Sequence, residues 1–177
     1  MAKQIVVKKQ ESTLIRPARK TDNGFYFLSN LDQNIAVMVR TIYAFNSPGK
    51  VNDHAVQTIK SSLAEALVHY HPVAGRLTIS KEGKLGIDCS EEGVVFVEAD
   101  AECHLSLLFD LKNADSDMLK CLVHDGPDAH NFLQTPPLIV QVTRFTCGGL
   151  AIGLCMSHCM FDGKSAIDFI TLWSDIA

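Results

Sequence analysis

The chain has 177 residues, and its formal net charge of −4 comes from 16 Lys and Arg against 20 Asp and Glu. This balance gives no electrostatic case for nucleic acid or an anionic membrane as a partner, and no apolar run reaches the roughly 18–20 residues of a membrane span. With 47% hydrophobic and 20% charged residues, the composition is that of a globular domain with a substantial core.

The first 45 residues are expected to form strands separated by loops. Residues 5–15 alternate imperfectly and favour a strand, and residues 17–24 are rich in turn formers. Residues 25–32 are expected to form an aromatic-rich loop or a short helix against the core. Residues 36–45 predict a strand because β-branched and aromatic side chains dominate them.

The clearest amphipathic helix comes next. Asn52 or Asp53 is a suitable N-cap. Apolar side chains then recur at three- and four-residue steps over residues 56–70, which predicts a helix with one buried face. Lys60 and Glu65 are expected on its solvent face.

The remaining elements are strands joined mainly by short turns, with two further helices. In chain order, we expect a tight turn over 73–76, strands over 77–79, 85–89 and 94–99, a short helix over 116–123, strands over 138–145 and 150–156, and a helix from about Lys164. Residues 147–149 predict a hairpin turn between the last two strands. This pattern indicates an α/β fold in which a mixed β-sheet is flanked by helices.

The six cysteines, at positions 89, 103, 121, 147, 155 and 159, contain no C-x-x-C pair. The N-terminal residues also lack the apolar region of a secretory signal. We therefore expect reduced cysteines, mostly buried as small apolar side chains, in a cytoplasmic protein.

His158 is the strongest candidate for chemistry, because it follows a buried strand and precedes a helix. An imidazole has an ordinary pKa near 6.5, which suits a general base at neutral pH. Asp162 could orient that imidazole, or it could hold the corner between strand and helix. Gly163 suits a corner where a side chain would clash or φ must be positive. The alternative interpretation is a structural histidine with a capping Asp.

Other chemistries have weak support. Cys159 is next to His158, but neighbours on an extended segment point in opposite directions, so activation of a cysteine nucleophile is not expected. Cys155, His158, Cys159 and Asp162 are zinc-ligand types, yet the second ligand pair of a structural zinc site is missing from the sequence. We therefore expect no metal site.

The segment His158-x-x-x-Asp162-Gly163 after an apolar strand resembles the signature of the plant BAHD acyl-CoA-dependent acyltransferases. Three other stretches match family features in the family's order. Residues 28–32 resemble an early L-S-x-x-D segment, residues 61–77 resemble a helix followed by Y-x-P-x-A-G-R, and residues 136–153 resemble the strand pair before the histidine.

The resemblance implies the N-terminal half of the CoA-dependent, chloramphenicol acetyltransferase-like acyltransferase fold. Residues 1–177 would form one domain. Family members have a second domain with a D-F-G-W-G motif, which does not occur in this sequence. The expected partner is therefore the second half or another copy of the chain, and an exposed apolar face is expected where that partner would lie.

For function, the resemblance is greatest with the branch that acts on long aliphatic hydroxyls in suberin and cutin formation. It implies transfer of a hydroxycinnamoyl group, such as feruloyl, from CoA to a fatty alcohol or an omega-hydroxy fatty acid. Acyl-CoA would be a co-substrate, with no bound cofactor. His158 would be the general base, Asp162 structural, Gly163 a residue that leaves room at the solvent channel, and Arg76 part of the fold. The rival hypotheses are a non-catalytic binding module and thioester hydrolysis by the same base.

Overall fold

The computed structural model describes residues 5–46, 53–108, 116–125, 133 and 135–177. Its main sheet has six strands in the order β1-β7-β8-β9-β4, and β2 also pairs with β7. The strands are β1 (Val7–Lys9), β2 (Thr13–Ile15), β4 (Met38–Phe45), β7 (Val94–Ala101), β8 (Leu138–Phe145) and β9 (Leu150–Ser157). The β7–β8 pair is parallel and the other pairs are antiparallel, so the sheet is mixed as predicted.

The register between β4 and β9 fixes the position of the histidine. Met38 lies opposite Ser157, and Phe45 lies opposite Leu150 at the other end of the pair. The chain therefore leaves β9 next to the beginning of β4. His158 is the first residue after β9 and therefore lies at this end of the strands.

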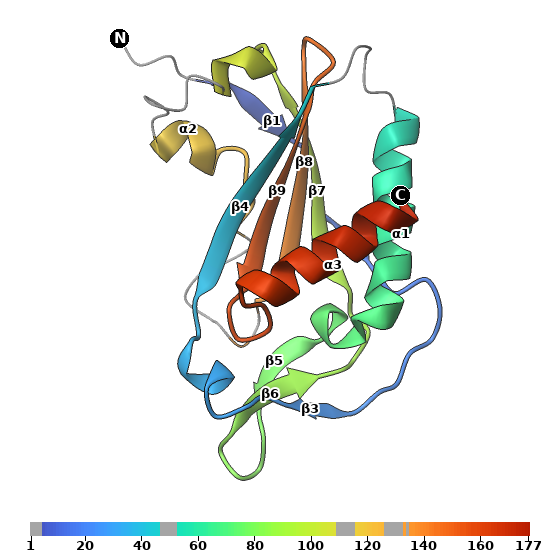
Figure 1. Cartoon of the computed structure of the whole chain (residues 1–177), viewed down its shortest axis with the longest axis vertical. Helices are drawn as coiled ribbons and strands as arrows, with labels where there is room; N and C mark the ends of the chain where they lie inside the picture. Colours follow the sequence, from blue (N-terminus) through green and yellow to red (C-terminus); the bar gives the residue numbers. More distant parts are fainter. Residues whose placement is uncertain (1–4, 47–52, 109–115, 126–132, 134) are drawn as a thin grey trace.

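Two helices cover one face of the sheet. They are α1 (Asp53–His69) and α3 (Gly163–Ile176), and Figure 1 shows α3 crossing in front of the strands towards α1. The largest core cluster joins apolar side chains of both helices to Phe96, Val140 and Leu154 of the sheet. Burial of this apolar surface is the main stabilising contribution to the packing of helices on the sheet.

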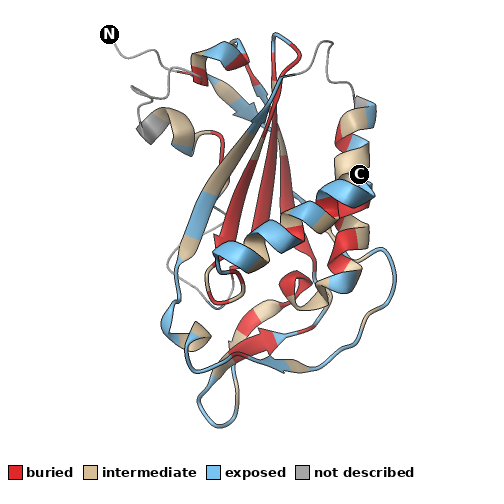
Figure 2. Cartoon of the chain, in the orientation of Figure 1, coloured by how far each residue is buried: buried red, intermediate tan, exposed pale blue. Residues whose placement is uncertain are grey.

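The opposite face of the sheet is buried as well. Val95 and Ile139 alternate with the core residues just named and form a second apolar cluster with Val123 and Cys155. The short helix α2 (Ser116–Lys120) and the 3₁₀ turn η3 (Leu105–Leu108) lie towards one end of the sheet. Figure 2 shows the central strands as buried along most of their length, whereas β4 at the edge carries exposed residues.

A smaller antiparallel sheet completes the fold, in the order β3 (Phe25–Phe27), β6 (Leu85–Asp88), β5 (Arg76–Ile79). The 3₁₀ turns η1 (Asp32–Asn34) and η2 (His71–Ala74) lead from β3 to β4 and from α1 to β5. Leu77 and Ile87 pack inwards with Cys159, which attaches this sheet to the turn that carries His158. Among the described residues, no helix is both long and apolar enough to cross a membrane.

Most predicted elements are confirmed, including the strand over 138–145 and the helix that begins near residue 53. The single strand over 5–15 is wrong, because it is two short strands. Three residues lie between Lys9 and Thr13, but only two lie between their β7 partners Ala99 and Phe96. The extra residue forms a bulge that interrupts the ladder. The loop or helix over 25–32 is also wrong in part, since its first three residues pair as β3.

The N-cap expectation for α1 is not tested, and two further expectations differ from the structure. Asn52 lies outside the described residues, and Asp53 is already the first residue of α1. Lys60 is not on the solvent face, because its Nζ lies 2.6 Å from Glu98 Oε1 and 5.2 Å from the centre of the Phe96 ring. The cysteines are not mostly buried: 89, 155 and 159 are buried, 103 and 121 are half-buried, and 147 is exposed.

Candidate active site

His158 is held by its backbone at the end of β9. Its N–H donates to the carbonyl oxygen of Val37 at 2.8 Å, and the carbonyl oxygen of Ser157 accepts from the N–H groups of Met160 and Phe161. These bonds fold residues 158–160 into a turn directly before α3. The imidazole is half-buried, and its Nδ1 atom is buried without a hydrogen-bond partner among the described residues.

The imidazole lines a pocket that encloses about 730 Å³ of empty space, part of it open to solvent. One wall is β4, another is the turn from His158 to Gly163, and the third is the first two turns of α3. The side chains from β4 are Val39, Thr41 and Tyr43, and those from α3 are Ala166, Ile167 and Ile170. The lining is mainly apolar with a few polar groups, which is the usual character of a small-molecule site.

Thr41 and Tyr43 are pocket residues that the sequence reasoning does not identify. Thr41 Oγ1 is buried and, within the described part of the chain, has no hydrogen-bond partner. The signal that could have located these residues is the strand alternation of β4, which places Val39, Thr41 and Tyr43 on one face. That face matters only because α3 packs opposite it, which the sequence does not reveal.

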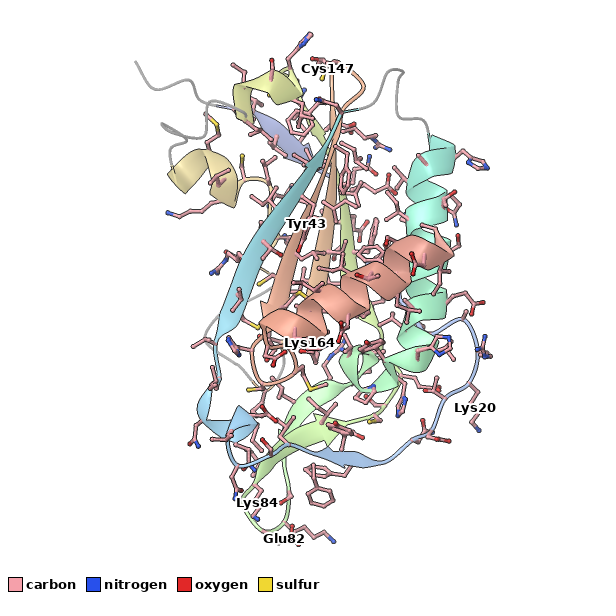
Figure 3. All side chains as sticks on the ribbon, viewed as in Figure 1. Lys20, Tyr43, Glu82, Lys84, Cys147 and Lys164 are labelled. Carbon is pink, nitrogen blue, oxygen red and sulfur yellow. The ribbon has the colours of Figure 1, made fainter. Side chains whose placement is uncertain are left out.

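A second, almost wholly apolar pocket adjoins the first. It encloses about 570 Å³ of empty space between the end of β4 and the last turns of α3. Tyr43 and Ile170 line both pockets, so these two side chains form the boundary between them. Figure 3 shows Tyr43 over the face of the sheet that α3 covers. The His158 pocket therefore adjoins a second, apolar space further along β4.

Asp162 caps α3 at its N-terminus. Its Oδ1 atom accepts hydrogen bonds from the backbone N–H and the hydroxyl of Ser165, both at 2.7 Å, and the Asp162 N–H donates to that hydroxyl at 2.9 Å. This reciprocal pattern is a capping box. Hydrogen bonds from the Ser165 backbone and side chain hold the pKa of Asp162 below its ordinary value. No hydrogen bond joins this carboxylate to the imidazole of His158, although the structure describes both residues.

Gly163 does not have the conformational reason that was expected. Its φ is not in the left-handed region, and a Cβ atom built on it would meet no atom within 4 Å. Both the expected clash and the expected positive φ are therefore wrong. Gly163 is instead the first residue of α3, and it lines the mouth of the His158 pocket.

Cys159 has the properties of a core residue. It is 2% exposed, its Sγ atom lies 3.4 Å from the carbonyl oxygen of Ile35, and burial raises the pKa of its thiol. A buried thiol with a raised pKa is a poor nucleophile. Among the described residues, no group of three or more His, Cys, Asp or Glu is placed to hold a metal ion.

Arg76 connects parts of the fold and lies outside the pocket. Its guanidinium donates to the carbonyl oxygens of Gly75 at 2.7 Å and Gly93 at 2.9 Å, and it lies 3.3 Å from Glu92. Burial lowers its pKa, and the carboxylate of Glu92 partly offsets that effect. These contacts tie the start of β5 to the turn before β7.

Comparison with known proteins gives concordant matches. The Transferase family model matches residues 5–177. Over 171 residues the chain is 55% identical to omega-hydroxypalmitate O-feruloyl transferase of Arabidopsis thaliana, covering 97% of this chain and 37% of that protein. Over 179 residues it is 48% identical to fatty alcohol:caffeoyl-CoA acyltransferase of the same species, with 98% and 41% coverage. The chain thus spans about two fifths of the length of these curated relatives.

The structural neighbours agree with the sequence matches. The crystal structure of vinorine synthase superposes with a TM-score of 0.80 and 27% identity, over 96% of this chain and 42% of that one. TRI101 of F. sporotrichioides, in complex with coenzyme A and T-2, superposes with a TM-score of 0.67 at 19% identity, which shows the fold alone. The predicted CoA-dependent acyltransferase fold is therefore confirmed, and the coverage fits one half of it.

Proposed function

The chain belongs to the Transferase family, the BAHD acyl-CoA-dependent acyltransferases, and on that premise we propose that it serves in transferring a hydroxycinnamoyl group, feruloyl by preference, from coenzyme A to an aliphatic hydroxyl. The acceptor is a fatty alcohol or an omega-hydroxy fatty acid, the acceptor types in the names of the two relatives above. The two adjoining apolar pockets support a substrate with a large apolar part. We further propose that this chemistry serves suberin or cutin formation, starting in the cytoplasm.

The observation on which the proposal rests is the half-buried imidazole of His158 at the wall of the larger pocket. As general base, His158 takes the proton of the acceptor hydroxyl while that oxygen attacks the thioester carbonyl. The C–S bond then breaks, the coenzyme A thiolate leaves, and the imidazolium returns the proton to the thiolate. The ester forms without an acyl-enzyme, in agreement with the buried, hydrogen-bonded state of Cys159.

We assign the neighbouring residues structural roles. Asp162 caps α3 and thereby fixes the turn that holds His158, and its hydrogen bonds to Ser165 support this role over that of orienting the imidazole. Gly163 leaves space at the pocket mouth, since a side chain there would project into open space. Acyl-CoA is a co-substrate in this scheme, and we assign no cofactor or metal to the chain.

We also propose that residues 1–177 form the N-terminal domain of a two-domain enzyme, with the D-F-G-W-G motif on the second domain. Val37, Val39 and Phe45 support this organisation. They are 52%, 41% and 49% exposed; Val37 immediately precedes β4, and the other two lie on it, at the end of the strand order of the main sheet in the described part of the chain. A second domain, or another copy of the chain, would cover this apolar edge.

The test is a chimera of residues 1–177 with the remaining residues of the Arabidopsis relative that is 55% identical. We expect the chimera to esterify 16-hydroxypalmitate with feruloyl-CoA, and a His158→Ala chimera to lose at least about 10²-fold in kcat. An active His158→Ala chimera would refute the role of His158. A folded chimera without ester formation would refute the proposed substrates.

The 177-residue chain assayed alone separates the rival hypotheses. Ester formation by the chain alone means that one domain, as a monomer or a dimer, has a working site. Binding of feruloyl-CoA without turnover supports a non-catalytic module. Release of ferulate in the absence of any alcohol supports a thioester hydrolase.

A further inference from the structure

Cys147 is an exposed thiol at the turn between β8 and β9, at the end of the sheet away from His158 (Figure 3). Its sulfur accepts a hydrogen bond from the backbone N–H of Leu105 at 3.3 Å. The N–H groups of Leu105 and Gly149 stabilise the thiolate and lower the pKa of Cys147. Exposure combined with stabilisation of the thiolate is the environment of a reactive cysteine.

A second cysteine, Cys103, lies on the adjoining segment of the chain. The segment after β7 runs along the β8–β9 turn, because the Thr146 N–H donates to the carbonyl oxygen of Cys103 at 3.1 Å, while the Leu105 N–H binds the Cys147 sulfur. Two hydrogen bonds thus connect the segment that contains Cys103 with the turn that contains Cys147. Cys103 is half-buried; burial raises the pKa of its thiol, and the nearby Cys121 and Cys147 raise it further.

The other four cysteines differ from Cys147 in the features that control reactivity. Cys89, Cys155 and Cys159 are buried, and burial raises the pKa of Cys155 to about 11. Cys121 is half-buried, and its pKa is raised by burial. Among the six, Cys147 therefore combines an exposed sulfur with a lowered pKa.

We propose that Cys147 is a site of reversible oxidation by hydroperoxides and that Cys103 resolves it as a disulfide. The Cys147 thiolate attacks one oxygen of hydrogen peroxide, the O–O bond breaks, and hydroxide leaves, so Cys147 becomes a sulfenic acid. The Cys103 sulfur then attacks the Cys147 sulfur, the S–O bond breaks, and the hydroxyl leaves as water with the Cys103 proton. Two thiols lose two electrons in total, and one peroxide becomes two waters.

The disulfide would connect the β8–β9 turn to the segment between β7 and η3. Its location, away from the His158 pocket, makes this modification independent of the proposed acyl transfer. A thiol reductant reverses it by thiol–disulfide exchange. The proposal therefore stands or falls on thiol chemistry and needs no assay of transfer.

The experiment treats the reduced 177-residue chain with hydrogen peroxide and maps its cysteines by mass spectrometry, with dimedone present to trap sulfenic acid. We expect a 103–147 disulfide in the native chain and dimedone on Cys147 in a Cys103→Ser variant. In a Cys147→Ser variant, oxidation of Cys103 should slow by at least about tenfold. Cys121→Ser is the matched control, and its yield of the 103–147 disulfide should equal that of the native chain.

Two results would overturn the proposal. One is a native chain in which Cys147 is oxidised no faster than Cys89 or Cys155. The other is a disulfide between Cys103 and Cys121 that forms equally well in the Cys147→Ser variant. Repeating the treatment in denaturant checks that selectivity depends on the fold, because unfolding removes the two N–H donors and should equalise the six rates.

Discussion

Replacement of Trp173 by Phe tests how α3 is attached to α1. The indole is 6% exposed and packs against Phe169 with ring centroids 6.2 Å apart. Its Nε1–H donates to Ser62 Oγ at 3.0 Å and to the carbonyl oxygen of Ile59 at 3.2 Å. This contact joins the last turns of α3 to the middle of α1, and thus stabilises the helix layer that forms one wall of the His158 pocket.

The expected cost of Trp173→Phe is about 2 kcal/mol in the free energy of unfolding. Loss of the hydrogen bond contributes about 1 kcal/mol, and loss of apolar contact by the smaller ring contributes about 1 kcal/mol more. No larger penalty is expected, because the Ser62 hydroxyl still donates to the Ile59 carbonyl oxygen at 3.1 Å, so no buried donor loses its partner. Trp173→Ala should cost about 3–5 kcal/mol, since it leaves a cavity.

The assay is urea unfolding followed by far-ultraviolet circular dichroism, because the chain has one Trp and the variant loses that fluorescence signal. A cycle with Ser62→Ala should give a coupling energy of about 0.5–1 kcal/mol. Ile167→Ser, at a side chain that is 63% exposed on the same helix, is the matched control and should change stability by less than about 0.5 kcal/mol. A Trp173→Phe cost equal to that of the control would refute this account of the packing of α3 on α1.

Three other substitutions have distinct expected outcomes. Asp162→Asn should leave acyl transfer by the chimera within about tenfold, because Asn caps helices as well as Asp, whereas loss of a triad carboxylate costs about 10⁴ in kcat. The pKa of Asp162 is lower in the folded chain than its ordinary value of 3.8. The stability contributed by the ionised carboxylate is therefore complete above pH 3.8 and is lost as the pH falls through the folded pKa. Urea midpoints of the native chain and Asp162→Asn should converge as the pH falls through that range. Gly153→Ala should cost about 1–3 kcal/mol or more in urea unfolding, because its Cβ would lie 2.0 Å from the carbonyl oxygen of Leu122; an unchanged midpoint would contradict the close approach. Glu98→Gln should cost about 1–2 kcal/mol, since Lys60 Nζ lies 2.6 Å from a carboxylate that is 20% exposed, and the loss should shrink in high salt.

The secondary structure was largely predictable because it depends on local patterns. The repeat of apolar residues over 56–70 located α1, and the apolar run before His158 located β9. The predictions that were wrong involve non-local pairing. The bulge between Lys9 and Thr13 exists because the paired stretch of β7 has one residue fewer. Phe25–Phe27 is a strand because it forms backbone hydrogen bonds with β6.

Only the candidate-site residues that are close together in the sequence were predictable. The spacing of His158, Asp162 and Gly163 places them at the corner between β9 and α3, where the structure has them. It could not identify Thr41 and Tyr43, which come from a strand more than a hundred residues earlier and face the histidine only because β4 pairs with β9. The sequence also suggested the wrong physical reason for a glycine at position 163, because the free space around a Cβ atom depends on residues that surround it in the fold.

Sequence alone thus determined which residue types stand at the corner before α3 and which family they resemble, since both follow from the order of residues in one chain. The tertiary structure decided what those residues contact. In the folded chain, the Asp162 carboxylate accepts a hydrogen bond from the first turn of α3, and His158 lines a pocket against β4. The Cys147 thiol lies beside the segment that contains Cys103. The physical reason is that hydrogen bonds, burial and pKa shifts depend on distances between atoms, and strand pairing and helix packing set those distances across long stretches of sequence.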